Sequence, residues 1–246
     1  MKIKQEAAID GSQLKMMLLG AYQSFENNYE MINNLNVFPV PDGDTGTNML
    51  HTMAAVAEAV SKLENPTIGE VGQTAARSAI LGARGNSGVI LSQLLHGIGK
   101  GLVGKEAATN NEIGKAFQYG ILYAYRSVSR PVEGTILTVA RGIAKGAYHA
   151  VRDGLEFTEV LNQAIVAGRA ELDRTPELLP ALKEAGVVDA GGQGLIVFFE
   201  GCLAALKGEV PPIFVPAAAP EVTLDLVEEF DLEYPYCTEF VVRDSH

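Results

Sequence analysis

The chain has 246 residues, and its 30 acidic residues outnumber its 19 lysines and arginines, which gives a formal net charge of −11. A chain of this length buries one substantial core, with room for a second small unit. No basic run is present to neutralise a phosphate backbone, so the composition argues against nucleic acid as a partner. The start has no apolar signal segment, and the apolar stretches are broken by glycine and polar residues. These features predict a cytoplasmic protein that is not embedded in a membrane.

Apolar residues recur at three- and four-residue steps through the first 208 residues, a pattern typical of amphipathic helices. Taken in chain order, helices are expected over about residues 14–35, 48–63, 68–81, 89–98, 110–128, 136–147, 159–172, 176–185 and 195–206. Glutamates three residues after Thr67 and Thr109 complete capping boxes at two of the helix starts. Single threonines are expected to cap four others: Thr47, Thr135, Thr158 and Thr175.

No convincing two-residue alternation appears before Gly208, so the predicted fold class is all-α, a bundle of about eight or nine antiparallel up-and-down helices. Residues 1–208 form the predicted helical domain, and residues 209–220 form a Pro/Ala-rich linker. Residues 221–246 carry strand-like signals and are expected to be the start of a second domain. The two cysteines, Cys202 and Cys237, are expected as buried or free thiols.

The stretch from Asn36 to Asn48 carries the strongest signal for chemistry. Asp42 and Asp44 flank a glycine, and a turning loop brings such a pair to one centre, whereas a helix separates them. A helix follows directly, so hard oxygen ligands lie beside a helix N-terminus, which suits Mg²⁺ and the phosphates of a nucleotide. The alternative interpretation is an acidic turn before a helix, with no ligand.

Three further loops are spaced so that they meet this one. In an up-and-down bundle, connections separated by a pair of helices lie at the same end, which places the Asp42 loop beside residues 85–88 and 133–135. Residues 186–194 join them when the short helix 176–185 is counted as part of the connection. Small residues at Gly85 and Gly88 open a helix and let a phosphate approach the backbone, and Ser87 adds a hydroxyl. Each loop alone also fits a plain structural role, as a helix cap or as a turn.

The motifs Asn36 to Asn48, Gly82 to Gly88, Pro131 to Thr138 and Val187 to Gly194 resemble, in the same order, those of the dihydroxyacetone kinase L-type nucleotide-binding family. The resemblance covers about residues 10–208, and the match to the N-terminal domain of the ATP-binding subunit of bacterial fatty acid kinases is closer. It implies a ring of eight antiparallel helices that binds ATP at one rim with two Mg²⁺ ions. It also implies metal ligands at Asp42, Asp44 and Asn36, where Asn36 stands near the place of a third aspartate in the family.

The nucleotide is assigned to residues of all four loops: Thr45, Gly46, Thr47, Asn48, Gly85, Asn86, Ser87, Gly88, Thr135, Asp189 and Gly191. The acceptor that the resemblance implies is a fatty acid held by a separate lipid-binding partner protein, and the product is an acyl phosphate. Because a carboxylate is already deprotonated near neutral pH, no general base is required, and none is assigned.

Several functions stay open at this point. The leading hypothesis is the ATP- and Mg²⁺-binding domain of a fatty acid phosphotransferase, whose isolated 246-residue chain binds ATP with little turnover. The alternatives are a dihydroxyacetone-type kinase subunit, a nucleotide-responsive regulatory module, and a helical lipid-binding scaffold whose loops are only turns. A homodimer through downstream domains is also left open.

Overall fold

The computed structural model describes residues 8–209. Most of the predicted linker, the predicted start of a second domain and Cys237 therefore lie outside the described residues. Eight long helices make up most of this part of the chain: α1 (Gly11–Asn34), α2 (Thr45–Ser61), α3 (Ile68–Gly82), α4 (Gly85–Gly101), α5 (Asn110–Ser127), α6 (Ile136–Arg152), α7 (Phe157–Asp173) and α10 (Ala190–Leu206). The short helices α8 (Thr175–Leu178) and α9 (Pro180–Ala185) connect α7 to α10.

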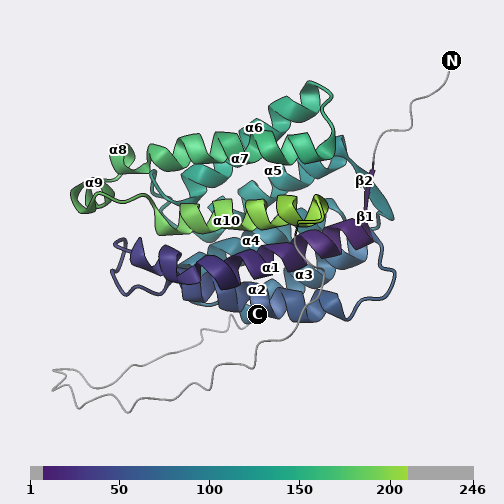
Figure 1. Ribbon diagram of the computed structural model, residues 1–246, viewed down its shortest axis with the longest axis horizontal. Helices are drawn as coiled ribbons and strands as arrows, with labels where there is room; N and C mark the ends of the chain where they lie inside the picture. Colours follow the sequence, from purple (N-terminus) through teal and green to yellow (C-terminus); the bar gives the residue numbers. More distant parts are fainter. Residues whose placement is uncertain (1–7, 210–246) are drawn as a thin grey trace, which may run out of the picture. The chain divides into compact units, whose positions relative to one another are not determined.

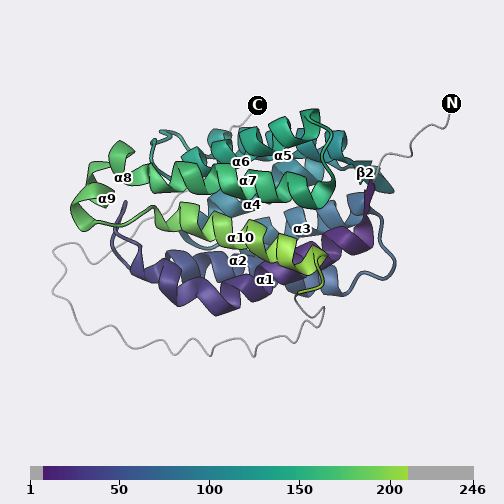
Figure 2. The same ribbon diagram turned by 45° about the horizontal axis from the view of Figure 1, so that its top comes forward.

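The long helices run alternately up and down and close into a ring (Figures 1 and 2). Each packs on its neighbour in the chain, and α10 packs on α1, α6 and α7, which closes the ring. The interior is filled by large side chains with under 2% exposure, among them Phe25, Met49, Met53, Leu91, Leu161 and Ile196. The predicted all-α ring of about eight antiparallel helices is confirmed. Within residues 8–209, no helix combines the length and apolarity that crossing a membrane requires.

The contact between α1 and α10 depends on glycine. A Cβ atom at Gly20 of α1 would lie only 2.6 Å from the Gly201 carbonyl oxygen of α10, so a side chain there would force the two helices apart. Next to this contact, the Cys202 thiol is buried, and burial raises its pKa. The expectation of a buried free thiol at this position is confirmed.

The helix starts show where local prediction succeeded and where it was wrong. Thr67 and Thr109 form the predicted capping boxes. Thr47 is not a cap, because α2 begins at Thr45 and has Asp44 as its N-cap residue. Thr158 is also not a cap, since Glu156 is the N-cap residue of α7.

Two more threonines use their hydroxyl groups in other ways. Thr135 precedes α6 but donates to the Val132 carbonyl oxygen, and Thr175 is buried and donates to Leu172 at 2.7 Å. The single short helix expected after Thr175 is divided into α8 and α9. A strand pair, β1 (Ala8–Asp10) with β2 (Ala107–Thr109), was not predicted, because three-residue strands are too short to show a period.

Candidate functional site

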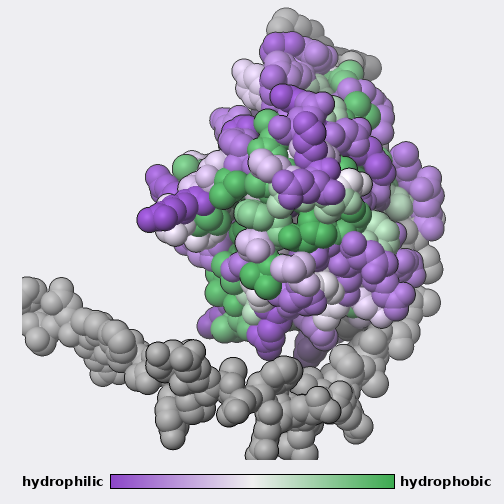
Figure 3. All heavy atoms as spheres, turned by 90° about the vertical axis from the view of Figure 1, so that its left-hand side faces the viewer, coloured by the Kyte–Doolittle hydropathy of each residue, from purple (hydrophilic) through white to green (hydrophobic). Residues whose placement is uncertain are grey.

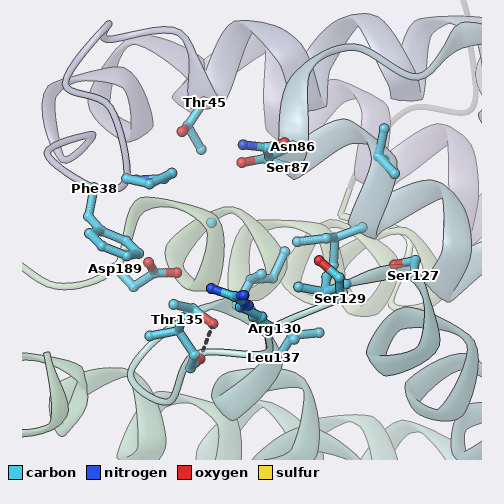
Figure 4. A pocket seen from close by; sticks show the side chains of 17 residues that line it. Phe38, Thr45, Asn86, Ser87, Ser127, Ser129, Arg130, Thr135, Leu137 and Asp189 are labelled. Carbon is cyan, nitrogen blue, oxygen red and sulfur yellow. Dashed lines mark hydrogen bonds between the residues drawn. The ribbon is translucent and has the colours of Figure 1, made fainter.

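One end of the ring, at the left of Figure 1, carries the α1–α2, α3–α4 and α5–α6 connections and the start of α10. A cavity of about 420 Å³ opens between these segments (Figure 4). Looking onto this end, apolar side chains gather near its middle, inside a polar border (Figure 3). The four loops that helix parity placed together therefore surround one cavity.

The cavity is lined by only part of the predicted set. The predicted residues that line it are Thr45, Asn86, Ser87, Thr135, Asp189 and Gly191. Those outside the lining are Asn36, Asp42, Asp44, Gly46, Thr47, Asn48, Gly85 and Gly88. Sequence reasoning missed the polar lining residues Ser127, Ser129 and Arg130 and the apolar lining residues Phe38, Pro39, Val89, Ile90, Val128, Val132, Ile136 and Leu137.

Asp42 lies on an exposed turn that a buried amide holds in place. Gly43, at φ 68°, makes the turn between Asp42 and Asp44. The Asn36 Nδ2 group donates to Asp42 Oδ1 and to the Val40 carbonyl oxygen, both at 2.8 Å, and Asn36 Oδ1 accepts from the Thr45 hydroxyl. Asn36, which the resemblance implies as a metal ligand, thus uses its amide to brace the loop and to orient the Asp42 carboxylate.

Asp44 keeps its carboxylate free because another residue caps its helix. An aspartate at an N-cap position ordinarily accepts a hydrogen bond from the first turn of the helix. Here Asp44 makes no such bond, and the Thr47 N–H donates instead to Asn33 Oδ1 of α1 at 3.1 Å. Asn33 Nδ2 also donates to the Thr47 hydroxyl at 2.9 Å. The Asp44 side chain consequently stays exposed and available to a ligand.

Two more helices start at the cavity without a cap bond from their own N-cap side chains. The N-cap residues of α4 and α6 are Arg84 and Thr135, and neither side chain accepts a bond from the first turn. Within residues 8–209, the Asn86 amide and the Ser87 hydroxyl also have no hydrogen-bond partner. Unsatisfied N–H groups and the positive end of the helix dipole make such starts favourable for anions.

Two of the predicted glycines are explained by helix packing. A Cβ atom at Gly46 would lie 2.1 Å from the Tyr29 carbonyl oxygen, and one at Gly88 would lie 2.4 Å from Thr52 Oγ1. Contacts this short require glycine whatever the cavity binds. At Gly85, with φ 56°, a Cβ atom would instead meet the Asn48 amide, which therefore lies directly behind the start of α4.

Asp189 ties the starts of α6 and α10 together from a buried position. Its carboxylate accepts from the Gly192 N–H at 2.7 Å and from the Ile136 N–H, while its own N–H donates to Thr175 Oγ1 at 3.0 Å. Burial raises the pKa of Asp189 to about 7, and the bonds from Gly192 and Ile136 oppose that rise. Asp189 is thus a helix cap as well as a lining residue.

The α5–α6 loop is braced from outside the cavity. Arg141 donates to both carboxylate oxygens of Glu133, at 2.8 and 2.7 Å, and the Thr138 hydroxyl donates to the same group at 2.7 Å. The Gly134 N–H completes the network by donating to Thr138 Oγ1 at 2.9 Å. Hydrogen bonding to Arg141 and Thr138 lowers the pKa of Glu133, so the brace is ionic near neutral pH.

Comparisons with known proteins agree with this architecture. The sequence pattern of the DAK2 domain matches residues 39–204. Protein YloV of Bacillus subtilis is 42% identical over 244 residues, which cover 96% of this chain and 44% of that protein. An uncharacterized protein of Staphylococcus epidermidis is 42% identical over 246 residues, with 96% and 44% coverage. The chain spans less than half the length of these relatives.

Solved structures share the fold. The dihydroxyacetone kinase from C. freundii in complex with AMP-PNP and Mg²⁺ gives a TM-score of 0.56 at 16% identity, covering 82% of this chain and 35% of that chain. The native form of the same kinase gives 0.55 at 17% identity, covering 82% and 36%. At this identity the likeness establishes a common arrangement of helices.

Proposed function

The chain belongs to the DAK2 domain family, and from this premise we propose that it is the ATP- and Mg²⁺-binding part of a fatty acid kinase. The acceptor is a fatty acid carboxylate held by a separate lipid-binding protein, and the product is an acyl phosphate. The observation that carries the proposal is the convergence on one cavity of three helix starts that their own N-cap side chains do not cap, beside the exposed carboxylates of Asp42 and Asp44.

The cavity suits a nucleotide in size and in the distribution of its lining. Its volume of about 420 Å³ falls in the range of roughly 300–1,000 Å³ that is usual for small-molecule sites. The starts of α2, α4 and α6 offer N–H groups for phosphates. Apolar side chains for the flat face of a base are Val89, Ile90, Val128 and Leu137.

The donors present fit Mg²⁺, with Asp42 and Asp44 as the residues that hold it. Within the described chain, no three or more His, Cys, Asp or Glu side chains cluster as a metal site. A carboxylate pair leaves coordination positions for phosphate oxygens and water, which Mg²⁺ prefers to an all-protein cage. When bound, Mg²⁺ neutralises charge on the phosphate oxygens. The resemblance implies two ions, and a metal titration measures that number.

The lining favours an acceptor that needs no general base. Among the described residues that line the cavity there is no His, Lys or Cys, and the Asp189 carboxylate already accepts two N–H bonds. A fatty acid carboxylate oxygen attacks the γ-phosphorus directly, the bond to the β–γ bridging oxygen breaks, and ADP leaves. Exposed apolar residues of the cavity-end loops, Val40 at 57% and Val132 at 41%, provide a surface for a partner carrying an acyl chain.

The test uses the chain extended to the length of its relatives. It is supplied with ATP, Mg²⁺, a fatty acid and a bacterial lipid-binding protein, and acyl phosphate is trapped with hydroxylamine and measured by mass spectrometry. A parallel reaction contains dihydroxyacetone instead. Acyl hydroxamate that depends on the lipid-binding protein is the expected result. Formation of dihydroxyacetone phosphate, or ATP binding with neither product, would contradict the fatty acid assignment.

A further inference from the structure

Arg130 is the single lysine or arginine among the described residues that line the cavity. It lies in the α5–α6 loop, and its guanidinium group projects toward the middle of the cavity, between the Asn86–Ser87 turn on one side and Thr135 on the other (Figure 4). Pro131 follows it, which disfavours helical backbone at Arg130 and ends α5 before it. The loop thus presents a cation to the cavity interior.

This cation has no partner in the part of the chain that the structure describes. Glu133 is only three positions away, but both of its oxygens are bonded by Arg141. The acid that lines the cavity, Asp189, accepts from the Gly192 N–H and the Ile136 N–H and forms no ion pair with Arg130. The two arginines therefore differ in role: Arg141 stabilises the loop through Glu133, and Arg130 remains available to bind a ligand.

The shape and charge of this exposed group indicate which ligand it meets. A planar guanidinium has five donors in a fork that matches phosphate oxygens. The molecule carries a net charge of −11 and presents two more carboxylates beside the cavity, so a polyphosphate needs local positive charge to enter. Resting on the proposed function, we propose that Arg130 binds the nucleotide through its polyphosphate chain.

The test compares the nucleotide affinities of Arg130→Met and Arg130→Lys with that of the unchanged 246-residue chain. Arg126→Met is the matched control, because Arg126 is exposed at the end of α5 and does not line the cavity. MgATP binding is measured by calorimetry, and adenosine binding by competition against a fluorescent ATP analogue. Thermal unfolding establishes that each variant is folded.

Loss of charge-assisted hydrogen bonds predicts that Arg130→Met weakens MgATP binding by about 10- to 100-fold. The adenosine affinity of Arg130→Met is expected to be unchanged. The MgATP affinity of Arg130→Lys should lie between those of Arg130→Met and the unchanged chain, and that of Arg126→Met should equal that of the unchanged chain. Equal MgATP affinity for Arg130→Met and the unchanged chain would overturn the inference. Parallel loss of ATP and adenosine affinity would also overturn it, because the role would then be structural. Failure of the unchanged chain to bind MgATP would instead refute the proposed function.

Discussion

The two ends of the helical ring start their helices in different ways. At the end that holds the β1–β2 pair, α1, α3 and α5 begin with Asp10, Thr67 and Thr109, each in a complete capping box. At the cavity end, α2, α4 and α6 begin without a cap from their own N-cap residues. The division has one exception at each end, since Glu156 does not cap α7 and Asp189 does cap α10.

The difference between the two ends separates helix starts that stabilise the fold from helix starts that can bind a ligand. A capping box satisfies orphan N–H groups inside the chain and stabilises the helix. At the cavity end, α4 has no side-chain cap bond, while α2 and α6 each receive a bond from a residue of another segment, Asn33 and Asp189. The remaining N–H groups of these first turns are left to a ligand. Departures from local rules are expected at functional sites, and here three of them surround one cavity. The changes below are expected to disturb one end without the other.

The largest effect is expected from removing both carboxylates of the cavity-end turn. Asp42→Ala with Asp44→Ala should abolish Mg²⁺-dependent ATP binding, a loss of more than about 100-fold, because no third acid is present among the described residues to replace them. Since both side chains are exposed, the free energy of unfolding should change by no more than about 1 kcal/mol. Calorimetry with MgATP measures the loss, and the exposed Glu64→Ala serves as the control. Undiminished binding would remove the metal assignment.

The next effect concerns pH and the buried acid at the cavity end. The pKa of Asp189 rises from 3.8 to about 7 on folding. Between these two pH values, the native chain therefore keeps a proton on Asp189 that the unfolded chain has lost. Its contribution to the unfolding free energy is complete below about pH 4 and is lost as the pH rises toward 7, at about 1.4 kcal/mol per pKa unit. Denaturant unfolding at several pH values should show this slope, and Asp189→Asn should flatten it. If the unfolding free energy of Asp189→Asn fell with pH as steeply as that of the unchanged chain, the raised pKa of Asp189 would be contradicted.

A smaller effect is expected at Asn33, which replaces Asp44 as the cap of α2. Asn33→Ala leaves the Thr47 N–H without its acceptor and should cost about 1 kcal/mol of stability. Because Asp44 can then turn back to cap the helix, Mg²⁺ affinity should fall as well. Asn33→Asp keeps the acceptor and should restore both quantities. Thermal unfolding and Mg²⁺ titration measure them, and a loss of stability with unchanged Mg²⁺ affinity would separate Asn33 from the metal site.

The smallest pair of effects contrasts one hydroxyl at each end. Thr67→Ala should lower stability by about 1 kcal/mol without changing ATP affinity, because it removes a capping box far from the cavity. Ser87→Ala should leave stability within about 0.5 kcal/mol, since this hydroxyl has no partner in the described chain, and should weaken ATP binding several-fold. Unfolding free energy and ATP affinity are measured for both variants. A loss of ATP affinity in Thr67→Ala together with a loss of stability in Ser87→Ala would contradict the difference between the two ends.

The sequence predicted what depends on local chemistry. Helix periodicity and the glutamates that follow Thr67 and Thr109 are local features, so the all-α bundle and two helix starts could be predicted from them, while the closed ring was implied by the family resemblance. The caps assigned to Thr47 and Thr175 were wrong because distant residues decide them. Thr47 meets Asn33 on another helix, and Thr175 is buried where it accepts from the Asp189 N–H.

The same limit applies to the candidate site. Helix parity placed four loops at one end, but it cannot show which side chains turn inward. Arg130 was not predicted as a lining residue, although the polar residues Ser127, Ser129 and Arg130 before the loop were a usable signal. Gly46 and Gly88 were assigned to the nucleotide by pattern, while their closest contacts are the Tyr29 carbonyl oxygen and Thr52 Oγ1. Whether they also contact phosphate stays a prediction.

The measurement that tests the account most directly is amide hydrogen exchange with and without MgATP. Protection should rise in the first turns of α2, α4 and α6, where N–H groups await phosphates, and should not change in the first turns of α1, α3 and α5. Protection spread evenly over both ends, or confined to the first turns of α1, α3 and α5, would contradict the claim that the cavity-end helix starts hold the nucleotide.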